Sequence, residues 1–247
     1  MRLKRLDPQY RKEKILTYVV SRYIQYITPV SSNQIVEERL FDLSPATIRN
    51  ILAELEEDGF LTHPHTSAGR IPTQDGYRYY VDHLMEEIDL LAIEKQRILA
   101  EYSQGVLELE ALLKKTSEIL AQETRYPAII SIDGYGDKTF CRGISFVAGY
   151  PEFHNFQKIE RLVHLLEEKE RILEIINRDL ERKIHIYIGD EAGCSDMEGC
   201  SLIVSRYGNE NGPKGSVALL GPTRMNYEKA ISNLEYFTEL IDEMLIR

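Results

Sequence analysis

The sequence predicts an α+β protein, and three observations support that prediction. Apolar residues recur at helical spacing in the first third of the chain, and capping and turn signals separate those segments. The second half alternates short strand-like runs with longer amphipathic segments. A chain of 247 residues, 43% of them hydrophobic, suits two modest domains that each bury a core.

The first predicted element is an amphipathic helix that follows a basic N-terminal segment. Leu16 and Val19 share one face of this helix, and the Thr28-Pro29 pair ends it. Ser31, followed three residues later by Gln34, forms a capping box, which marks the start of a short second helix.

A third helix begins after a short turn, and both of its ends carry local signals. Ser44 is a good N-cap, and Pro45 suits the first helical position, where a missing N–H costs nothing. Gly59 stands where a helix C-terminus favours a residue that tolerates positive φ. Four apolar residues share one face: Ile48, Ile51, Leu52 and Leu55.

The opposite face of the third helix has small and polar residues that suit entry into a DNA major groove. Arg49 can bond guanine bidentately, Asn50 can do the same to adenine, and alanines let the backbone come close. The alternative is a solvated face with an incidental Arg and Asn. The candidate DNA contacts of this helix are Ser44, Ala46, Thr47, Arg49 and Asn50.

A β-hairpin follows, with its first strand starting at residues 60–61 and its turn and return at residues 63–70. Gly69 permits a tight turn, and Arg70 can lie along phosphates or enter the minor groove. His65, Thr66 and Ser67 are the other predicted phosphate or sugar contacts. The order helix, helix, turn, helix, hairpin predicts a winged helix-turn-helix over residues 1–82.

A metal site in this hairpin is an alternative that the residues do not favour. His63 and His65 alternate as two ligands on a strand would, but no cysteine lies nearby and no acidic residue falls at ligand spacing in the loop. We therefore expect no metal.

Residues 83–122 read as a helical linker that can supply a dimer interface. Positions that recur at alternating steps of four and three are mostly apolar, which is the pattern of a coiled-coil seam. Lys95 and Gly105 weaken the seam, and the alternative is that these helices pack on their own domain. The candidate dimer contacts are Leu84, Ile88, Leu91, Ile98 and Tyr102.

The remaining residues, 123–247, predict a sheet with helices packed against it. The predicted helices cover residues 158–180 and 227–246. Residues 221–224 are expected to form a turn that caps the second helix through Thr223 or Asn226, and the alternative is that Arg224 contacts a ligand or partner. The predicted strands are 128–132, 139–147, 184–188, 201–206 and 216–220.

The net charge of −10 belongs to the second part of the chain. Residues 1–84 hold 11 basic and 11 acidic residues, whereas residues 85–247 hold 19 and 29. The acidic half would repel DNA and so orient the molecule. The neutral first half predicts modest non-specific affinity, so binding would depend on base contacts and on dimerisation.

The sequence predicts neither an enzyme nor a membrane protein. It contains no G-x-S-x-G, no H-E-x-x-H and no phosphate-binding loop, so we expect no catalytic residue and no cofactor. Its apolar runs are too short for a membrane span, and no signal core follows the basic N-terminus. The three cysteines, Cys141, Cys194 and Cys200, read as reduced thiols of a cytoplasmic protein.

Two long stretches resemble the heat-inducible transcription repressor (HrcA) family of bacteria. The first is LSPATIRNILAELEEDGFLTHPHTSAGRIPTQDGYRYYVDHL, similar to the family's winged helix. The second consists of residues 201–207, Gly215 and residues 221–227, which are similar to the end of its GAF-like domain, and residues 119–130 resemble the start of that domain. The resemblance implies a GAF-like α+β regulatory domain over residues 123–247. It also implies an operator upstream of chaperone operons, release on heat stress, and a chaperonin that helps keep the repressor active.

The chain departs from this family in one respect. The family usually carries a dimerising domain inserted into the GAF-like domain, and the segment between Ile130 and Ile184 has no room for it. The usual dimer interface therefore cannot be carried over.

The function expected from the sequence is a DNA-binding repressor that acts as a homodimer on an inverted-repeat operator in double-stranded DNA. Two alternatives remain open. One is a ligand-sensing regulator with a small molecule bound in the GAF-like domain, and the other is an interaction module whose winged helix binds protein.

Overall fold

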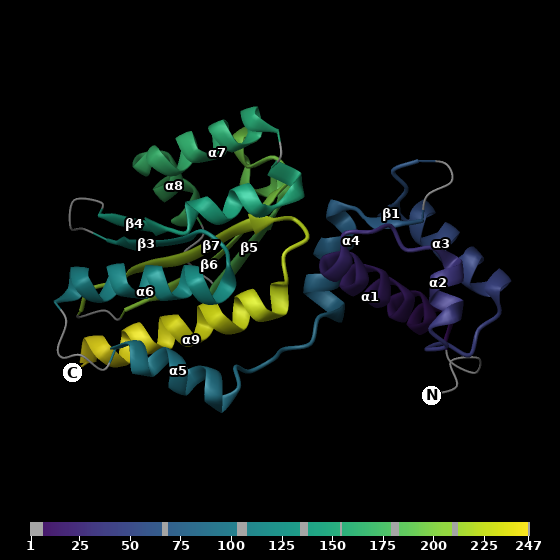
Figure 1. The fold of residues 1–247 in the computed structure, drawn as a ribbon, viewed down its shortest axis with the longest axis horizontal. Coiled ribbons are helices and arrows are strands. Elements are labelled where there is room, and N and C mark those ends of the chain that lie inside the picture. The colour runs from purple at the N-terminus through teal and green to yellow at the C-terminus, as the bar shows by residue number, and fades with distance from the viewer. Residues whose placement is uncertain are drawn as a thin grey trace. The chain divides into compact units, whose positions relative to one another are not determined.

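The computed structural model describes residues 7–65, 69–102, 108–133, 138–153, 155–178, 183–208 and 212–246. It contains both helices and an antiparallel sheet, which confirms the α+β class (Figure 1). The chain divides into two compact units, Met1–Glu86 and Glu87–Arg247. Within the described ranges, no helix combines the length and apolarity that crossing a bilayer requires.

Three helices open the first unit: α1 (Pro8–Tyr26), α2 (Ser32–Glu37) and α3 (Pro45–Glu57). The capping box predicted for α2 is confirmed. The Ser31 N–H donates to Gln34 Oε1 over 2.7 Å, and the Gln34 N–H donates to Ser31 Oγ over 3.3 Å. Both bonds satisfy N–H groups that a helix start leaves without partners.

Both ends of α3 also follow the local signals. The Thr47 N–H donates to Ser44 Oγ over 3.1 Å at the start. At the end, Gly59 has φ of 82°, and the Phe60 N–H donates to the Leu55 carbonyl over 2.9 Å. The Gly59 N–H donates to the Glu56 carbonyl over 3.1 Å, which completes a Schellman motif. The end of α3 is therefore fixed, and it delivers the chain directly into the hairpin.

The hairpin consists of β1 (Leu61–Thr62) and β2 (Ile71–Pro72), paired antiparallel. The Val30 and Arg70 backbones exchange hydrogen bonds of 2.9 and 2.8 Å, so the chain ahead of α2 is bonded to the returning strand. Two short helical elements complete the unit, α4 (Gln74–Tyr79) and the π-helical turn η2 (Tyr80–Leu84). The Tyr79 hydroxyl donates to Glu13 Oε1 on α1 over 3.0 Å.

The second unit is built on a five-stranded antiparallel sheet with strand order β4-β3-β7-β6-β5. In the central pair Leu202 lies opposite Leu220, and Ala218 of β7 also lies opposite Ile129 of β3. The strands are β3 (Ala128–Ile132), β4 (Thr139–Arg142), β5 (Ile184–Ile188), β6 (Cys200–Tyr207) and β7 (Gly215–Pro222).

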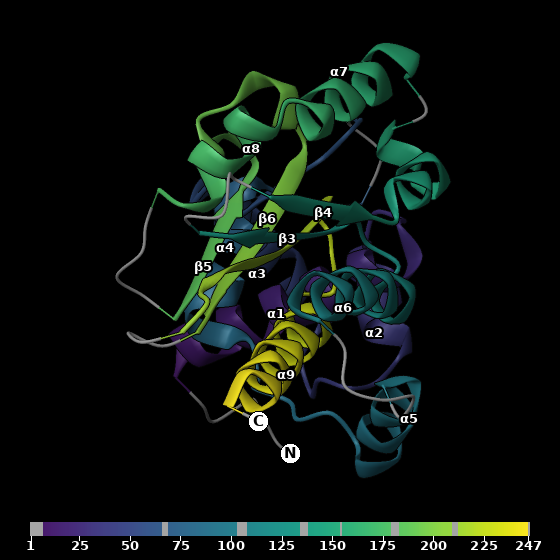
Figure 2. The same ribbon diagram turned by 90° about the vertical axis from the view of Figure 1, so that its left-hand side faces the viewer.

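Helices cover both faces of this sheet (Figure 2). One face packs against α6 (Leu109–Thr124) and α9 (Tyr227–Ile246), and the other against α7 (Phe156–Glu167) and α8 (Lys169–Ile176). A further helix, α5 (Ala92–Tyr102), is held beside α9, where the Tyr236 hydroxyl donates to the Lys95 carbonyl over 3.3 Å. Short 3-10 helices lie in the connections that the structure describes: η3 (Ile144–Gly149), η4 (Pro151–Phe153), η5 (Gly189–Ala192) and η6 (Ser195–Met197).

Two elements of the second unit differ from the sequence expectation. The strand expected over residues 139–147 ends at Arg142, because Gly143 adopts φ of 79° and the chain turns into η3. The helix expected over residues 158–180 is divided at Glu168, whose ψ of 80° leaves the helical region. Both halves nevertheless bury apolar side chains in the same core against the sheet.

We predict that two glycines of the first unit differ sharply in their tolerance of alanine. A Cβ on Gly76 would lie 2.1 Å from the Phe60 carbonyl oxygen, whereas one on Gly59 would meet nothing within 4 Å and only strain a φ of 82°. Gly76→Ala should lower the free energy of unfolding by about 3 kcal/mol and Gly59→Ala by about 1 kcal/mol. Urea unfolding of the two variants measures this order, and the reverse order would contradict the packing of α4 on the hairpin.

Candidate nucleic-acid interface

The two faces of α3 are as the sequence predicts. The four apolar residues are buried, from fully for Ile48 to 6% exposed for Ile51, and α1 and α2 pack against this helix. The opposite face is open to solvent and consists of small and polar side chains: Ala46, Arg49, Asn50 and Ala53. The helix therefore presents a narrow face on which a duplex could approach the backbone closely.

Ser44 and Thr47 lie at the N-terminal edge of this face. The Ser44 hydroxyl caps the helix and lies 2.8 Å from the Thr47 hydroxyl. Ser44 is exposed and Thr47 is half-buried. Both side chains therefore fix the start of α3, and their contact with DNA remains a prediction.

The structure brings Arg49 and Arg70 to one surface pocket of about 360 Å³. Its remaining lining comes from the start of α2 and the two residues before it, from Leu52 of α3 and from Gly69 of the hairpin. A Cβ on Gly69 would lie 2.5 Å from the Val30 carbonyl carbon, so glycine is needed where the hairpin approaches the chain ahead of α2. The helix face and the returning strand thus meet at this pocket.

Arg70 has a partner that the sequence analysis did not foresee. Its Nη2 lies 2.6 Å from Oε2 of Glu56 in the last turns of α3, and Nδ1 of His63 lies against the other oxygen of the same carboxylate. One acid therefore joins both strands of the hairpin to the helix. Only the fold brings these three residues together, because α3 ends at Glu57 and the hairpin then turns the chain back onto the helix.

The pKa of Glu56 reflects this environment. Partial burial raises the pKa of this carboxyl, but the hydrogen bond from His63 and the positive charge of Arg70 together outweigh burial. The pKa therefore lies below its ordinary value of 4.5. The carboxylate is charged at neutral pH and holds the hairpin against α3.

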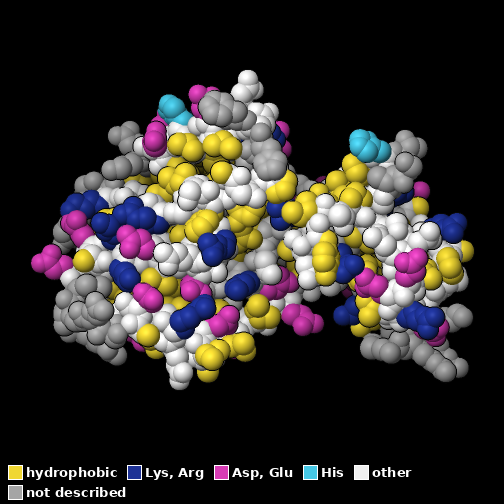
Figure 3. All heavy atoms as spheres, viewed as in Figure 1, with side chains coloured by type: hydrophobic (Ala, Val, Ile, Leu, Met, Phe, Trp, Pro, Cys, Tyr) yellow, Lys and Arg dark blue, Asp and Glu magenta, His cyan; other side chains and the backbone are white. Residues whose placement is uncertain are grey.

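The hairpin tip carries the other predicted contacts. His65 is exposed, and histidine side chains are visible on the surface above β1 (Figure 3). Thr66 and Ser67 lie outside the described residues, so their contacts remain predictions. Among the described residues there is no group of three or more potential ligands placed to hold a metal ion.

The predicted dimer contacts fall into two groups. Ile88 and Leu91 are exposed, by 48% and 66%, and Leu84 is half-buried. Ile98 and Tyr102 are buried in their own unit, where the Tyr102 hydroxyl donates to Thr116 Oγ1 on α6 over 2.8 Å. This packing favours the alternative in which α5 packs on its own domain.

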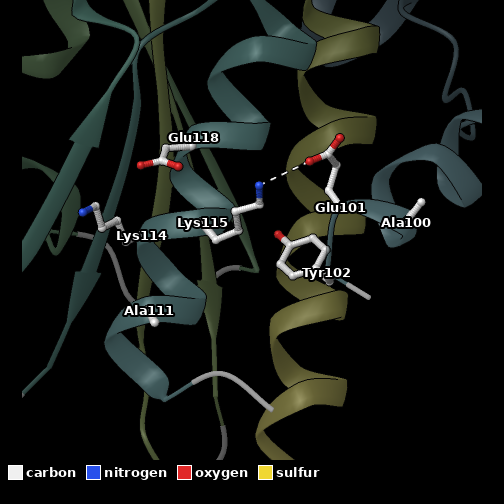
Figure 4. Close-up of a pocket in the computed structure, with 7 residues that line it drawn as sticks. All are labelled: Ala100, Glu101, Tyr102, Ala111, Lys114, Lys115 and Glu118. Atoms are coloured by element: carbon white, nitrogen blue, oxygen red, sulfur yellow. Dashed lines mark hydrogen bonds and ion pairs between the residues drawn. The ribbon is translucent and has the colours of Figure 1, made fainter. Parts of the chain in front are cut away.

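A hollow of about 570 Å³ beside Tyr102 separates α5 from α6 (Figure 4). Lys115 and Glu101 point toward one another across it and form an ion pair of 3.2 Å. Lys114 and Glu118 complete its charged lining, so the positive and negative charges balance. Such a pairing is typical of two helices in contact.

Two side chains singled out in the second unit are accounted for by packing. Arg224 is 9% exposed and forms a bidentate ion pair with Glu152, which agrees with a structural role for the turn before α9. Burial raises the pKa of the Cys200 thiol to about 12, so this cysteine is protonated and inert.

Comparison with known proteins supports the resemblance found in the sequence. The family model "HrcA protein C terminal domain" matches residues 133–231. The heat-inducible transcription repressor HrcA of Carboxydothermus hydrogenoformans is 28% identical, with 95% of this chain and 97% of that protein covered. The HrcA of Geobacter sulfurreducens is 25% identical, with 97% and 98% covered.

The alignments also bear on the compact form of the chain. The alignment with the Carboxydothermus protein spans 333 positions. The chain has 247 residues, so at least 86 of those positions have no counterpart in it. The relative therefore carries positions that this chain lacks, which agrees with the expectation of a compact form.

A solved structure supports the fold. A crystal structure described as a hypothetical protein at 2.2 Å resolution matches with a TM-score of 0.77 and 20% sequence identity, and 98% of each chain is covered. At that identity the likeness concerns the fold alone.

These relatives define the class of the protein as a transcription repressor, which is not an enzyme class. Over 95% of its length the chain is similar to heat-inducible transcription repressors named HrcA, and residues 133–231 match the HrcA C-terminal domain model.

We predict that the clamp formed by Glu56 gives the first unit a pH-dependent stability. Because the pKa of Glu56 is depressed, its contribution is present above pH 4.5 and is lost as the pH falls through the lower folded-state pKa. Urea unfolding at pH 7 and at pH 3 should show Glu56→Gln less stable than the wild type at pH 7 and nearly equal to it at pH 3. A difference that is the same at both pH values would argue against an ionic clamp.

Proposed function

We propose that this protein is a sequence-specific DNA-binding repressor of heat-shock (chaperone) operons, acting in the cytoplasm. Its first unit serves as a winged helix-turn-helix, with α3 as the recognition helix and the β1–β2 hairpin as the wing. Its second unit serves as a GAF-like regulatory domain. The observation that supports this most directly is the exposed small and polar face of α3, held outward by four buried apolar residues.

The charges on α3 favour approach of DNA to its N-terminal half. Arg49 and Asn50 lie in that half, whereas the C-terminal half and its C-cap carry four acidic residues: Glu54, Glu56, Glu57 and Asp58. Lys12 on α1 pairs with Glu54 and Asp58, and Arg70 pairs with Glu56, so the acids on this side are partly neutralised. In this docking the N-terminal residues of α3 reach the base edges, as is usual for a recognition helix.

The repressor acts as a homodimer on an inverted repeat. Two recognition helices would lie in successive major grooves about 34 Å apart, or a multiple of that distance. The exposed residues Ile88 and Leu91 are the candidate contacts. Release on heat stress would follow from loss of the dimer, because one half-site binds far more weakly than two joined ones.

The HrcA names of the relatives support the heat-stress part of this proposal. Support from the chaperonin remains an expectation from the resemblance to the family. A second candidate function, regulation by a small ligand in the GAF-like unit, is favoured by a cationic pocket in that unit, whose lining includes Arg97 and Lys229.

We predict that Arg49 contributes to base recognition rather than to charge alone. Fluorescence anisotropy should compare a labelled inverted-repeat operator of the heat-shock type with a scrambled duplex across a salt series. The wild type should prefer the operator by about a thousandfold or more. Arg49→Ala should lower that preference by roughly tenfold to a hundredfold, since a bidentate pair to guanine contributes about 1–3 kcal/mol of discrimination.

Arg22→Ala is the matched control, because it removes a cation of the same unit that does not belong to the α3 face. Arg22 lies on α1 and forms an ion pair of 2.9 Å with Glu38. It should leave the preference for the operator unchanged. Equal losses of preference in the two variants would mean that net charge, and not the α3 face, governs binding.

We predict that the dimer depends on Leu91 and not directly on Ile98. Leu91→Gln should shift the mass measured by light scattering toward the monomer while leaving thermal stability nearly unchanged, because this side chain is 66% exposed. Ile98→Gln should instead lower the melting temperature, because Ile98 is 1% exposed. A dimer mass that persists in Leu91→Gln would exclude this residue from the interface.

A further inference from the structure

A pocket of about 550 Å³ lies on the second unit, where α6 ends. Four segments line it: α5, the last turn of α6, η3 and the first turn of α9. Its lining residues are Arg97, Gln122, Glu123, Arg125, Phe146 and Lys229. None of them belongs to the face of α3 or to the hairpin.

This pocket is positively charged within an acidic part of the chain. Arg97 forms an ion pair with Glu123, the only carboxylate in the lining. Within the described residues, Arg125 and Lys229 have no carboxylate partner, so the lining holds two uncompensated cations. Residues 85–247 as a whole contain 29 acidic and 19 basic residues, so the pocket runs against the charge of its surroundings.

The backbone conformation of Arg125 does not require an arginine at this position. It follows the last residue of α6 with φ of 62°, a left-handed conformation that glycine adopts far more readily. Its N–H donates to the Ala121 carbonyl over 2.9 Å, and its carbonyl accepts the Tyr150 hydroxyl over 2.5 Å. Because the backbone supplies both bonds, the side chain is not required to end the helix.

The side chain of Arg125 is instead directed over an aromatic ring. Its guanidinium carbon lies 5.3 Å from the centroid of Phe146, which also lines the pocket. A cation placed over a ring in this way keeps its N–H edge available for hydrogen bonds in the plane of the guanidinium. Those N–H groups match the spacing of two oxygens on a phosphate group.

We propose that this pocket binds the phosphate group of a small phosphorylated molecule. Arg125 supplies the bidentate contact, Lys229 supplies a second positive charge, and the Gln122 amide can donate a further hydrogen bond. Glu123 does not repel the ligand strongly, because Arg97 neutralises it. The site does not depend on whether α3 binds DNA, and the experiment that tests it contains no DNA.

The test is isothermal titration of the full chain with inorganic phosphate, at constant ionic strength set with chloride. The wild type should give a saturable binding curve, and Arg125→Gly should weaken the affinity at least tenfold. Glycine fits φ of 62°, so this variant should melt at the wild-type temperature or higher, and lost binding cannot be ascribed to lost fold.

Arg39→Gly is the matched control. Arg39 is another exposed arginine with positive φ, 53°, but it lies at the end of α2 in the first unit. This variant should bind phosphate as the wild type does. The proposal is overturned if the wild type shows no saturable binding, or if Arg125→Gly retains wild-type affinity, or if Arg39→Gly loses as much affinity as Arg125→Gly.

Discussion

Burial of one face of α3 is the constraint on which the first unit depends. Each of its buried aliphatic side chains contributes about 2 kcal/mol relative to an exposed one. The helical repeat ties the two faces together, so burial of Ile48 and Leu52 leaves Arg49 and Asn50 in solvent. Rotating the helix by one residue so that Arg49 took the place of Ile48 would bury an unpaired guanidinium, which costs free energy. The same packing that stabilises the unit therefore orients the face proposed to read DNA.

The clamp at the other end of α3 limits how the wing can act. Glu56 binds both His63 and Arg70, so in the free protein the wing cation is already matched by a carboxylate. A DNA phosphate would have to compete with Glu56 for Arg70. Among the predicted contacts that the structure describes, Arg49 is the arginine without a carboxylate partner. This fits a first half of zero net charge, in which base contacts rather than phosphate attraction would supply most of the selectivity.

The sequence predicts what local signals determine and misses what the tertiary structure decides. Ser44 and Gly59 mark both ends of α3 because capping depends on adjacent residues. The pairing of Glu56 with Arg70 depends on the hairpin folding back onto the helix, and no spacing rule encodes it. Gly143 was an available signal for the end of β4, whereas nothing at Glu168 marks the break between α7 and α8. The apolar spacing that includes Ile98 and Tyr102 cannot say whether their own domain or a second chain buries these two side chains.

The short second unit makes the dimer the weakest part of the proposed repressor. The relatives carry positions that this chain lacks, and those positions cannot contribute contacts to a dimer interface here. Among the described residues of the second unit, three of the four large exposed apolar side chains lie at or just before the start of α5, where Leu91 is 66% and Ile93 is 73% exposed, and the fourth is Leu99 further along that helix. An interface built on so few side chains would be small, and its association would depend on protein concentration. A repressor that needs both half-sites would then lose its operator when a modest rise in temperature shifts that equilibrium, with no need for either unit to unfold.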